Sequence, residues 1–421
     1  MANEILEGIR VLDMTMWQLG PVNTMMLATM GAEVIKIESP RGDDGRWMTI
    51  GGVVHGGQGK GSGGWDIGSY FETNNRLKKG LVLDLTKPRA REILYQLVAK
   101  SDVFEQNLRF GVAKKLGCDY ETLKKYNPKL IYCNGTSYGT RGPDATKPGM
   151  DLSGAARSGW MYNSGTEDGN PVWALPGSSD QIGAIFGAFA IVTALLARER
   201  FGIGQEVETS HLTGSMWLMG DAIQMLYYSK REQPIAVPRS KSAMPLFSFY
   251  KCGDGEWITM VNPTSRHWQP LCEALGIPAS IWRDDPRFST EQARYENRVE
   301  TVKLLDSYFA KKSREDWIKE FEGKDIFWER LQHFTDLEKD PQVILNEYMT
   351  DYTHPLTGET YKYQNLPMQF WGTPAMRQGR APLLGEHTAE ILVNILGYKK
   401  EDVTKLIEEI GAPQVPPKPG R

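Results

Sequence analysis

The sequence predicts an α/β protein in which helices cover a parallel sheet and a smaller α+β domain is inserted. Two observations predict the sheet: apolar, β-branched segments recur through about the first 140 residues, and helix-forming segments separate them. A third marks the small domain, because hairpin and charged-helix patterns take over near residue 230. We therefore expect a large domain over 1–229, a small domain over 230–380, and a helical return to the large domain over 381–421.

The first half of the chain shows the strand–helix alternation most clearly. Residues 9–15 (IRVLDMT) are apolar and β-branched, as in a buried parallel strand. Residues 20–32 carry a proline near the first helical position and end near a glycine, which indicates a helix. The same patterns predict further strands at 32–38, 80–86, 102–107 and 129–139, and a helix at 87–101.

In the second half of the chain the pattern of predicted elements changes. Residues 176–199 (PGSSDQIGAIFGAFAIVTALLARE) predict a long apolar helix, and QEVETS (205–210) predicts a strand. The small domain is expected to open with a hairpin over 246–261 that turns at Gly253-Asp254-Gly255. Charged helices such as 297–313, a second hairpin around 354–364 and a helical tail are expected to follow.

Composition excludes several classes of function. The 421 residues carry a net charge of −3, so no basic face for nucleic acid is indicated. The four cysteines show neither CxxC pairs nor zinc-type spacing with the six histidines, which favours reduced thiols and no metal site. No signal-peptide pattern is seen, and glycines and Thr193 interrupt the most apolar segment, 181–197. We expect a cytoplasmic protein with no membrane partner.

A glycine-rich stretch, residues 51–65, contains the spacing G-x-G-x-x-G at Gly59, Gly61 and Gly64. Dinucleotide-binding loops need a strand before this motif and a helix after it, and here glycines lie on both sides. The stretch is interpreted either as a flexible surface loop or as a mobile flap over a site. The motif H-E-x-x-H is absent, so zinc hydrolysis is poorly supported.

Asp180 is the candidate catalytic residue, because it stands after a glycine–serine turn at the start of the long apolar helix. One interpretation is a helix N-cap, which stabilises by about 1 kcal/mol and needs no chemistry. The other is a nucleophile for acyl transfer, kept ionised by the helix N-terminus, whose backbone N–H groups also hold a developing oxyanion. The residues alone leave both interpretations open.

Five segments, in order along the chain, resemble the class III CoA-transferases, the family of formyl-CoA transferase and carnitine CoA-transferase. The opening segment is GIRVLDMT…ESPRGD, and the last is LLGEHTAEIL near the C-terminus. Between them lie the entry NRLKKGLVLDLT, the region SYGTRGPDATKPGMD and the Asp180 helix running to GIGQEVETS. Each segment by itself matches the family only loosely, but the occurrence of all five in the same order makes the resemblance specific.

The resemblance implies a Rossmann-like large domain, a small domain within it, and an interlocked homodimer. It also implies that Asp180 attacks an acyl-CoA thioester to give a mixed anhydride, which CoA converts to an aspartyl-CoA thioester. A small carboxylic acid then receives the CoA through a second anhydride. Coenzyme A and acyl-CoA are substrates in this scheme, and no tightly bound cofactor is expected.

The resemblance also places residues around CoA. Gln18 is expected at the thiol end and Tyr138 near the active centre. Arg41 is a looser match, because Ser39 and Pro40 stand where relatives carry arginine. The remaining expected contacts, all to the nucleotide, are Lys78, Asn107, Leu108 and Lys115.

The chain departs from its relatives in two places. The segment 238–250 contains no glycine, although formyl-CoA transferase has a glycine run there that covers the intermediate. Met150 stands where the family's acyl-CoA racemases carry a histidine, so a racemase is an alternative function, as is a non-catalytic CoA-binding paralogue.

Aromatic and methionine residues such as Trp17 and Trp173 indicate either ordinary core and interface packing or a pocket for an aryl or branched acid. Succinyl-CoA, acetyl-CoA and an aryl acyl-CoA are all compatible with the sequence as CoA donors.

Overall fold

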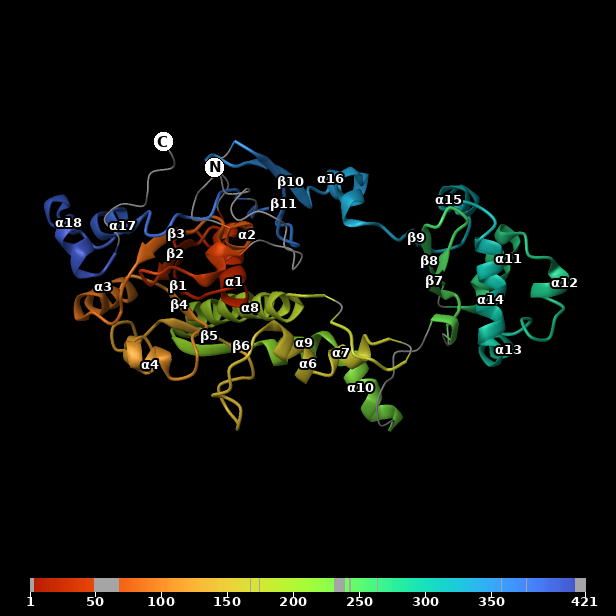
Figure 1. Ribbon diagram of the computed structural model, residues 1–421, viewed down its shortest axis with the longest axis horizontal. Helices are drawn as coiled ribbons and strands as arrows, with labels where there is room; N and C mark the ends of the chain where they lie inside the picture. The colour runs from red at the N-terminus through yellow and green to blue at the C-terminus, as the bar shows by residue number, and fades with distance from the viewer. Residues whose placement is uncertain are drawn as a thin grey trace. The chain divides into compact units, whose positions relative to one another are not determined.

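The computed structural model describes residues 4–48, 68–166, 168–173, 175–230, 239–241, 244–262, 264–356, 358–375 and 377–412. The glycine-rich stretch 51–65, expected as a loop or a flap, lies outside these residues. The chain forms two compact units (Figure 1). The first comprises residues 1–161, 173–234 and 344–421, and the second comprises residues 162–172 and 235–343.

The first unit is built on the strands β1 (Arg10–Met14), β2 (Glu33–Glu38), β3 (Lys79–Val82), β4 (Val103–Gln106), β5 (Ile131–Thr136) and β6 (Gln205–Ser210). They form one parallel sheet in the order β3-β2-β1-β4-β5-β6. At its centre, Leu12 pairs with Ile35 of β2 on one side and with Phe104 of β4 on the other. The predicted parallel α/β fold is confirmed. In sheets of this order, ligands bind beyond the carboxyl ends of the strands, where the strand order reverses.

Helices cover both faces of this sheet and follow its strands. Those before β6 are α1 (Leu19–Thr29), α2 (Ser69–Asn75), α3 (Pro88–Val98), α4 (Val112–Leu116), α5 (Tyr120–Leu123), α6 (Asp151–Arg157), α7 (Trp160–Asn163) and α8 (Ser178–Phe201), with the 3₁₀ turn η1 (Asp44–Trp47). Those after it are α9 (His211–Leu218), α10 (Gly220–Ser229), α17 (Thr388–Asn394) and α18 (Lys400–Glu409). The short helix α16 (Pro341–Leu345) spans the point in the chain where the two units divide.

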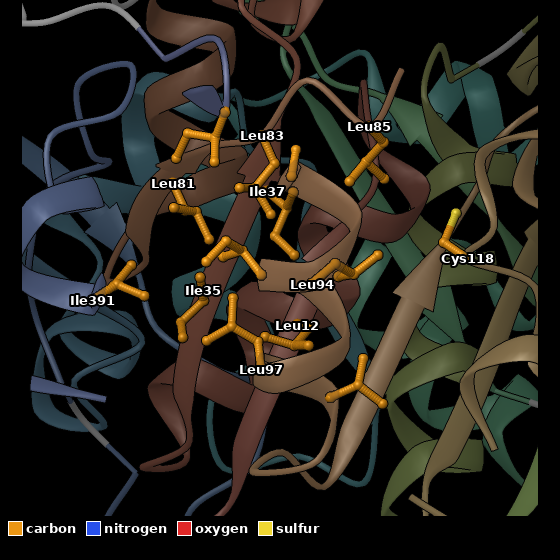
Figure 2. Packing of buried hydrophobic residues seen from close by; sticks show 14 of the residues in the cluster. Leu12, Ile35, Ile37, Leu81, Leu83, Leu85, Leu94, Leu97, Cys118 and Ile391 are labelled. Atoms are coloured by element: carbon orange, nitrogen blue, oxygen red, sulfur yellow. The ribbon is translucent and has the colours of Figure 1, made fainter. Parts of the chain in front are cut away.

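Two apolar clusters hold these layers together. On one face of the sheet, Leu12 and Ile35 pack with Leu97 of α3, and Ile391 of α17 joins them (Figure 2). The C-terminal segment therefore completes the core of the first unit. On the other face, the strands pack against α1 and α8. Alternating strand residues serve the two faces, which explains why the central strands carry apolar residues on both faces.

The helix α8 is the central element of the second face. It packs against α1, β6 and α9. Among the described residues it is also the one helix long and apolar enough to cross a membrane. A single such helix is weak evidence, because the core helix of a globular unit passes the same test.

The second unit contains an antiparallel sheet, and its first hairpin confirms the one predicted over 246–261. Its strands are β7 (Phe247–Lys251), β8 (Trp257–Val261) and β9 (Trp328–Arg330). Its helices are α11 (Trp268–Leu275), α12 (Ala279–Trp282), α13 (Glu291–Glu296), α14 (Arg298–Phe309) and α15 (Arg314–Phe321), with the turns η2 (Arg239–Lys241), η3 (Ser265–His267) and η4 (Phe334–Lys339). Its core is aromatic: Tyr250 stacks on Phe309 with ring centroids 4.8 Å apart, and Trp317 stacks on Phe321.

The second hairpin, β10 (Met349–Thr353) and β11 (Thr360–Gln364), belongs to the first unit. The division between units thus falls at residue 343, where we expected the small domain to extend to 380. Contacts with α2 account for the difference. The Tyr363 hydroxyl donates to Glu72 Oε1 at 2.8 Å, and the guanidinium of Arg76 lies 4.3 Å from the Tyr363 ring centroid.

Candidate active site

The N-terminus of α8 is capped by another helix, and Asp180 does not cap it. Asp180 is the third helical residue, and no side-chain cap is formed at the N-cap residue Gly177. Instead Asp151 of α6 accepts the N–H groups of Ser179 at 2.7 Å, Asp180 at 3.1 Å and Gly177 at 2.9 Å. The capping interpretation of Asp180 is therefore wrong. The same bonds occupy the backbone donors that we expected to hold an oxyanion.

The side chain of Asp180 lies in the wall of a cavity of about 1170 Å³. One carboxylate oxygen, Oδ1, is 2.8 Å from Nε2 of His211. Among the described residues, no hydrogen bond engages the other oxygen, Oδ2. The Asp180 side chain is 14% exposed. This carboxylate is held at one oxygen and open to the cavity at the other, as a nucleophile requires.

Gln18 reaches the same cavity from the start of α1, so the structure brings it together with Asp180. Its Nε2 donates to Gln181 Oε1 at 3.2 Å, and the Tyr70 hydroxyl donates to its Oε1 at 3.4 Å. Burial, together with the nearby Asp180 carboxylate, raises the pKa of Tyr70. The phenol is therefore protonated at neutral pH and serves as a hydrogen-bond donor near Asp180.

Asn107 and Leu108 lie at the switch point of the sheet, directly after β4. The side chain of Asn107 accepts the N–H of Met16 at 2.8 Å and donates to its carbonyl at 2.7 Å. It thereby holds the loop after β1, in which Trp17 adopts the left-handed φ of 68°. Leu108 packs against the main cluster of the first unit. Asn107 therefore shapes the loop that presents Gln18.

Lys78 lies inside the protein, with no exposed side-chain surface. Its ammonium donates to Asp13 Oδ2 at 2.7 Å, to the Pro21 carbonyl at 2.8 Å and to Asn75 Oδ1 at 2.9 Å. An ammonium has three N–H donors, so these bonds use all of them. Burial alone would raise the pKa of Asp13, but Lys78 and Lys36 outweigh it and lower that pKa to about 2. Lys78 therefore holds the sheet together and presents no cation to a nucleotide, contrary to our expectation.

The other expected CoA contacts lie along the carboxyl edge of the sheet. Arg41 follows β2, and Lys115 lies in α4, which follows β4; both are exposed. Tyr138 follows β5, with the guanidinium of Arg157 at 5.1 Å and the Lys147 ammonium at 5.6 Å from its ring centroid. None of Arg41, Lys115 and Tyr138 is among the described residues that line the Asp180 cavity. They surround the approach to the edge instead.

Sequence reasoning missed one residue of the cavity and one residue that contacts Asp180. It left His211 unassigned, although a residue directly after a parallel strand lies at the edge where ligands bind. It also found no basic side chain for a second carboxylate, yet Arg76 lines the cavity. Burial lowers the pKa of the Arg76 guanidinium, which donates to the Gln364 carbonyl at 3.3 Å.

Comparisons with known proteins identify the family of this chain. A family model described as CoA-transferase family III matches residues 6–388. The succinyl-CoA:glutarate CoA-transferase of Mus musculus is 31% identical over 410 residues, which cover 96% of this chain and 89% of that protein. The succinyl-CoA:mesaconate CoA-transferase of Haloarcula hispanica is 32% identical over 391 residues, which cover 92% of this chain and 95% of that protein.

The solved structures agree on the fold. The crystal structure of a CaiB/BaiF family protein from Brucella suis superposes with a TM-score of 0.79 and 27% identity, covering 93% of this chain and all of that one. The family model spans nearly the whole chain, as the five ordered segments do. The resemblance inferred from those segments is confirmed: the chain belongs to CoA-transferase family III and is a CoA-transferase.

Proposed function

We propose that this enzyme moves CoA from succinyl-CoA, or a similar acyl-CoA, to a free carboxylic acid, with Asp180 as the covalent nucleophile. The observation that carries the proposal is the carboxylate of Asp180, held at Oδ1 by His211 and open to a large cavity at Oδ2. The relatives from Mus musculus and Haloarcula hispanica are named for succinyl-CoA as donor, which supports this choice.

The reaction proceeds through four acyl transfers that need no external energy source. Asp180 Oδ2 attacks the donor thioester, and CoA thiolate leaves to give a mixed anhydride. The thiolate then attacks the Asp180 carbonyl carbon, which releases the donor acid and leaves an aspartyl-CoA thioester. The acceptor carboxylate displaces CoA from this thioester to form a second anhydride. Thiolate finally attacks the acceptor carbonyl, giving the new acyl-CoA and free Asp180.

The CoA substrate is placed along the carboxyl edge of the sheet, with its thiol end at Gln18. Arg41 and Lys115 are exposed cations at that edge, and they would meet the phosphates of the nucleotide. Asn107 supports the loop that carries Gln18, and Leu108 directly follows it at the switch point of the sheet. Tyr138 would border the pantetheine near the active centre. The cavity exceeds the size of a typical small-molecule site, so it accommodates the thiol end of CoA together with an acid.

The acid is proposed to be a dicarboxylate. Arg76 gives the cavity a partly buried guanidinium that would pair with a distal carboxylate. The two relatives are named for glutarate and mesaconate, which supports the same class. Met25, Met26 and Ile185 add an apolar wall, which would suit the aryl or branched acids expected from the sequence. Those acids are the second candidate class.

The reaction and the acid are tested together by incubating the enzyme with succinyl-CoA or acetyl-CoA and a panel of acids. Mass spectrometry of the acyl-CoA products identifies each acceptor. We expect dicarboxylyl-CoA products, and none from Asp180→Asn. Transfer by Asp180→Asn would overturn the mechanism. CoA binding without any turnover across the panel would instead favour a non-catalytic paralogue.

Deuterium uptake at the α-carbon of an acyl-CoA, without acid exchange, would favour a racemase. The site argues against that alternative. Met150, at the position of the racemase histidine, is 52% exposed. The neighbouring Asp151 is occupied by the backbone of α8.

An interlocked homodimer in the cytoplasm completes the proposal. Exposed apolar side chains gather on α8, α9 and α10, and a second copy would cover them: Phe189, Leu196, Trp217, Met225, Tyr227 and Tyr228. Light scattering of the eluting protein should give the mass of two chains. A monomer at micromolar concentration would contradict this part.

A further inference from the structure

His211 is fixed against the nucleophile by the packing of three helices. It is the first residue of α9, whose N-cap Ser210 accepts the N–H of Thr213 at 3.0 Å. A Cβ atom on Gly154 of α6 would lie 2.5 Å from the Cβ of His211, so α6 is in close contact with this residue. A Cβ on Gly214 would lie 2.9 Å from a side-chain atom of Ile182, so α9 packs closely on α8 as well. His211 as a whole residue is 8% exposed, so its imidazole has little freedom to move.

The contact with Asp180 determines which ring nitrogen carries hydrogen. The carboxylate oxygen accepts, so Nε2 of His211 is the donor in the 2.8 Å bond. The other ring nitrogen, Nδ1, is buried and finds no partner among the described residues. A neutral imidazole with its hydrogen on Nε2 matches this environment, because Nδ1 then needs no acceptor. His211 thus directs one N–H at Asp180 Oδ1.

This geometry has a consequence for the covalent intermediates. When Oδ2 is the attacking oxygen, Oδ1 becomes the carbonyl oxygen of the anhydride and then of the thioester. Addition of thiolate or of the acceptor carboxylate to the Asp180 carbonyl carbon moves the π electrons onto Oδ1. Donors that stabilise such an oxyanion lie 2.7–3.1 Å from it, and His211 Nε2 is already at 2.8 Å. The backbone donors of the α8 N-terminus are taken by Asp151.

We propose that His211 is a catalytic residue, the oxyanion donor for the two steps in which the carbonyl carbon of Asp180 is itself attacked. This inference rests on the proposed function. In the first of these steps a C–S bond forms, and the C–Oδ2 bond breaks to release the donor carboxylate. In the second, a C–O bond to the acceptor forms and the C–S bond breaks to release CoA thiolate. The hydrogen stays on Nε2 in both steps. The attack of Asp180 on the donor thioester places its oxyanion on the substrate, so that step does not use His211.

Two substitutions of His211 separate its hydrogen bond from its volume. His211→Leu removes the donor and keeps an apolar side chain, whereas His211→Gln retains an amide N–H near the position of Nε2. Loss of one oxyanion donor lowers kcat by about 10²–10³-fold, and we expect this for His211→Leu. His211→Gln should recover most of that loss, and His211→Asn, which is one methylene shorter, should recover less. His387→Leu is the control for losing an imidazole bond elsewhere in the same unit, since His387 Nδ1 accepts the N–H of Gly80.

The decisive readout is which intermediate accumulates. After rapid mixing with succinyl-CoA and acid quench, intact-protein mass spectrometry distinguishes acylated enzyme from enzyme bearing CoA. We expect His211→Leu to release a burst of CoA thiol and to accumulate the acyl anhydride, whereas wild type carries mainly CoA. Wild-type turnover by His211→Leu, absence of the CoA burst, or equal loss in the Gln and Leu variants would overturn the role of His211. Transfer by Asp180→Asn would instead overturn the proposed function, so the two failures are distinguishable.

Discussion

Replacing Asp151 by alanine should both destabilise the first unit and misplace the nucleophile. The Asp151 carboxylate accepts three backbone N–H groups at the start of α8 and the Trp173 indole N–H at 3.2 Å. Each hydrogen bond to a buried charge contributes about 1.5–3 kcal/mol, but water partly replaces these partners at a helix end, where one cap is worth about 1–2 kcal/mol. We expect the free energy of unfolding to fall by about 3 kcal/mol. At about 2 cal/mol/K per residue over a few hundred residues, that lowers Tm by roughly 5 °C.

The same substitution should reduce turnover, because Asp151 fixes the backbone of Asp180. A displacement of about 1 Å at a reacting group costs on the order of 10²-fold in rate. Differential scanning calorimetry and a CoA-transfer assay on the folded variant measure the two effects. Asp144→Ala is the matched control, since its exposed pair with Arg157 is worth about 1 kcal/mol or less. An Asp151→Ala protein as stable and as active as the control would refute the trans-capping account.

The remaining predictions concern charges around the site. Arg76→Gln should raise KM for a dicarboxylic acceptor at least ~10-fold and leave KM for a monocarboxylic one nearly unchanged, as steady-state kinetics will show. Lys78→Met should lower the free energy of unfolding in urea by about 3–5 kcal/mol, because it leaves Asp13 buried without its cation. Lys115→Ala, in contrast, should leave the free energy of unfolding nearly unchanged and raise KM for CoA, most strongly at low salt. The Asp13 pKa of about 2 lies below its ordinary value of 3.8, so the ionised pair stabilises the folded state above pH 4. That contribution is lost as the pH falls toward 2, and the stability gap between wild type and Asp13→Asn should narrow over that range.

The parallel sheet was predictable because most of its strands contain local apolar, β-branched runs separated by helix-forming segments. The segment predicted at 205–210 is the strand Gln205–Ser210, and the one predicted at 32–38 is Glu33–Glu38. The helix start at Asp180 was also predictable, but the local pattern fitted a cap as well as a nucleophile, and the cap is Asp151.

Long-range contacts were not accessible. The cap of α8 comes from Asp151, and the donor to Asp180 is His211, which follows β6. Both partners are distant in the chain, so no local sequence pattern indicates either pairing. The role of Lys78 was misjudged for the same reason. A lysine in an apolar strand entry looks like a free cation until the fold brings Asp13 to its ammonium.

The most direct test of the account is chemical capture of the acyl-enzyme at Asp180. The enzyme is mixed with succinyl-CoA, quenched with borohydride during turnover, digested, and mapped by mass spectrometry. We predict reduction of the Asp180 carboxyl carbon to an alcohol in wild type, and no such change without donor or in Asp180→Asn. CoA transfer at full rate with Asp180 unmodified, or transfer by Asp180→Asn, would contradict the claim that this carboxylate carries the acyl group and CoA.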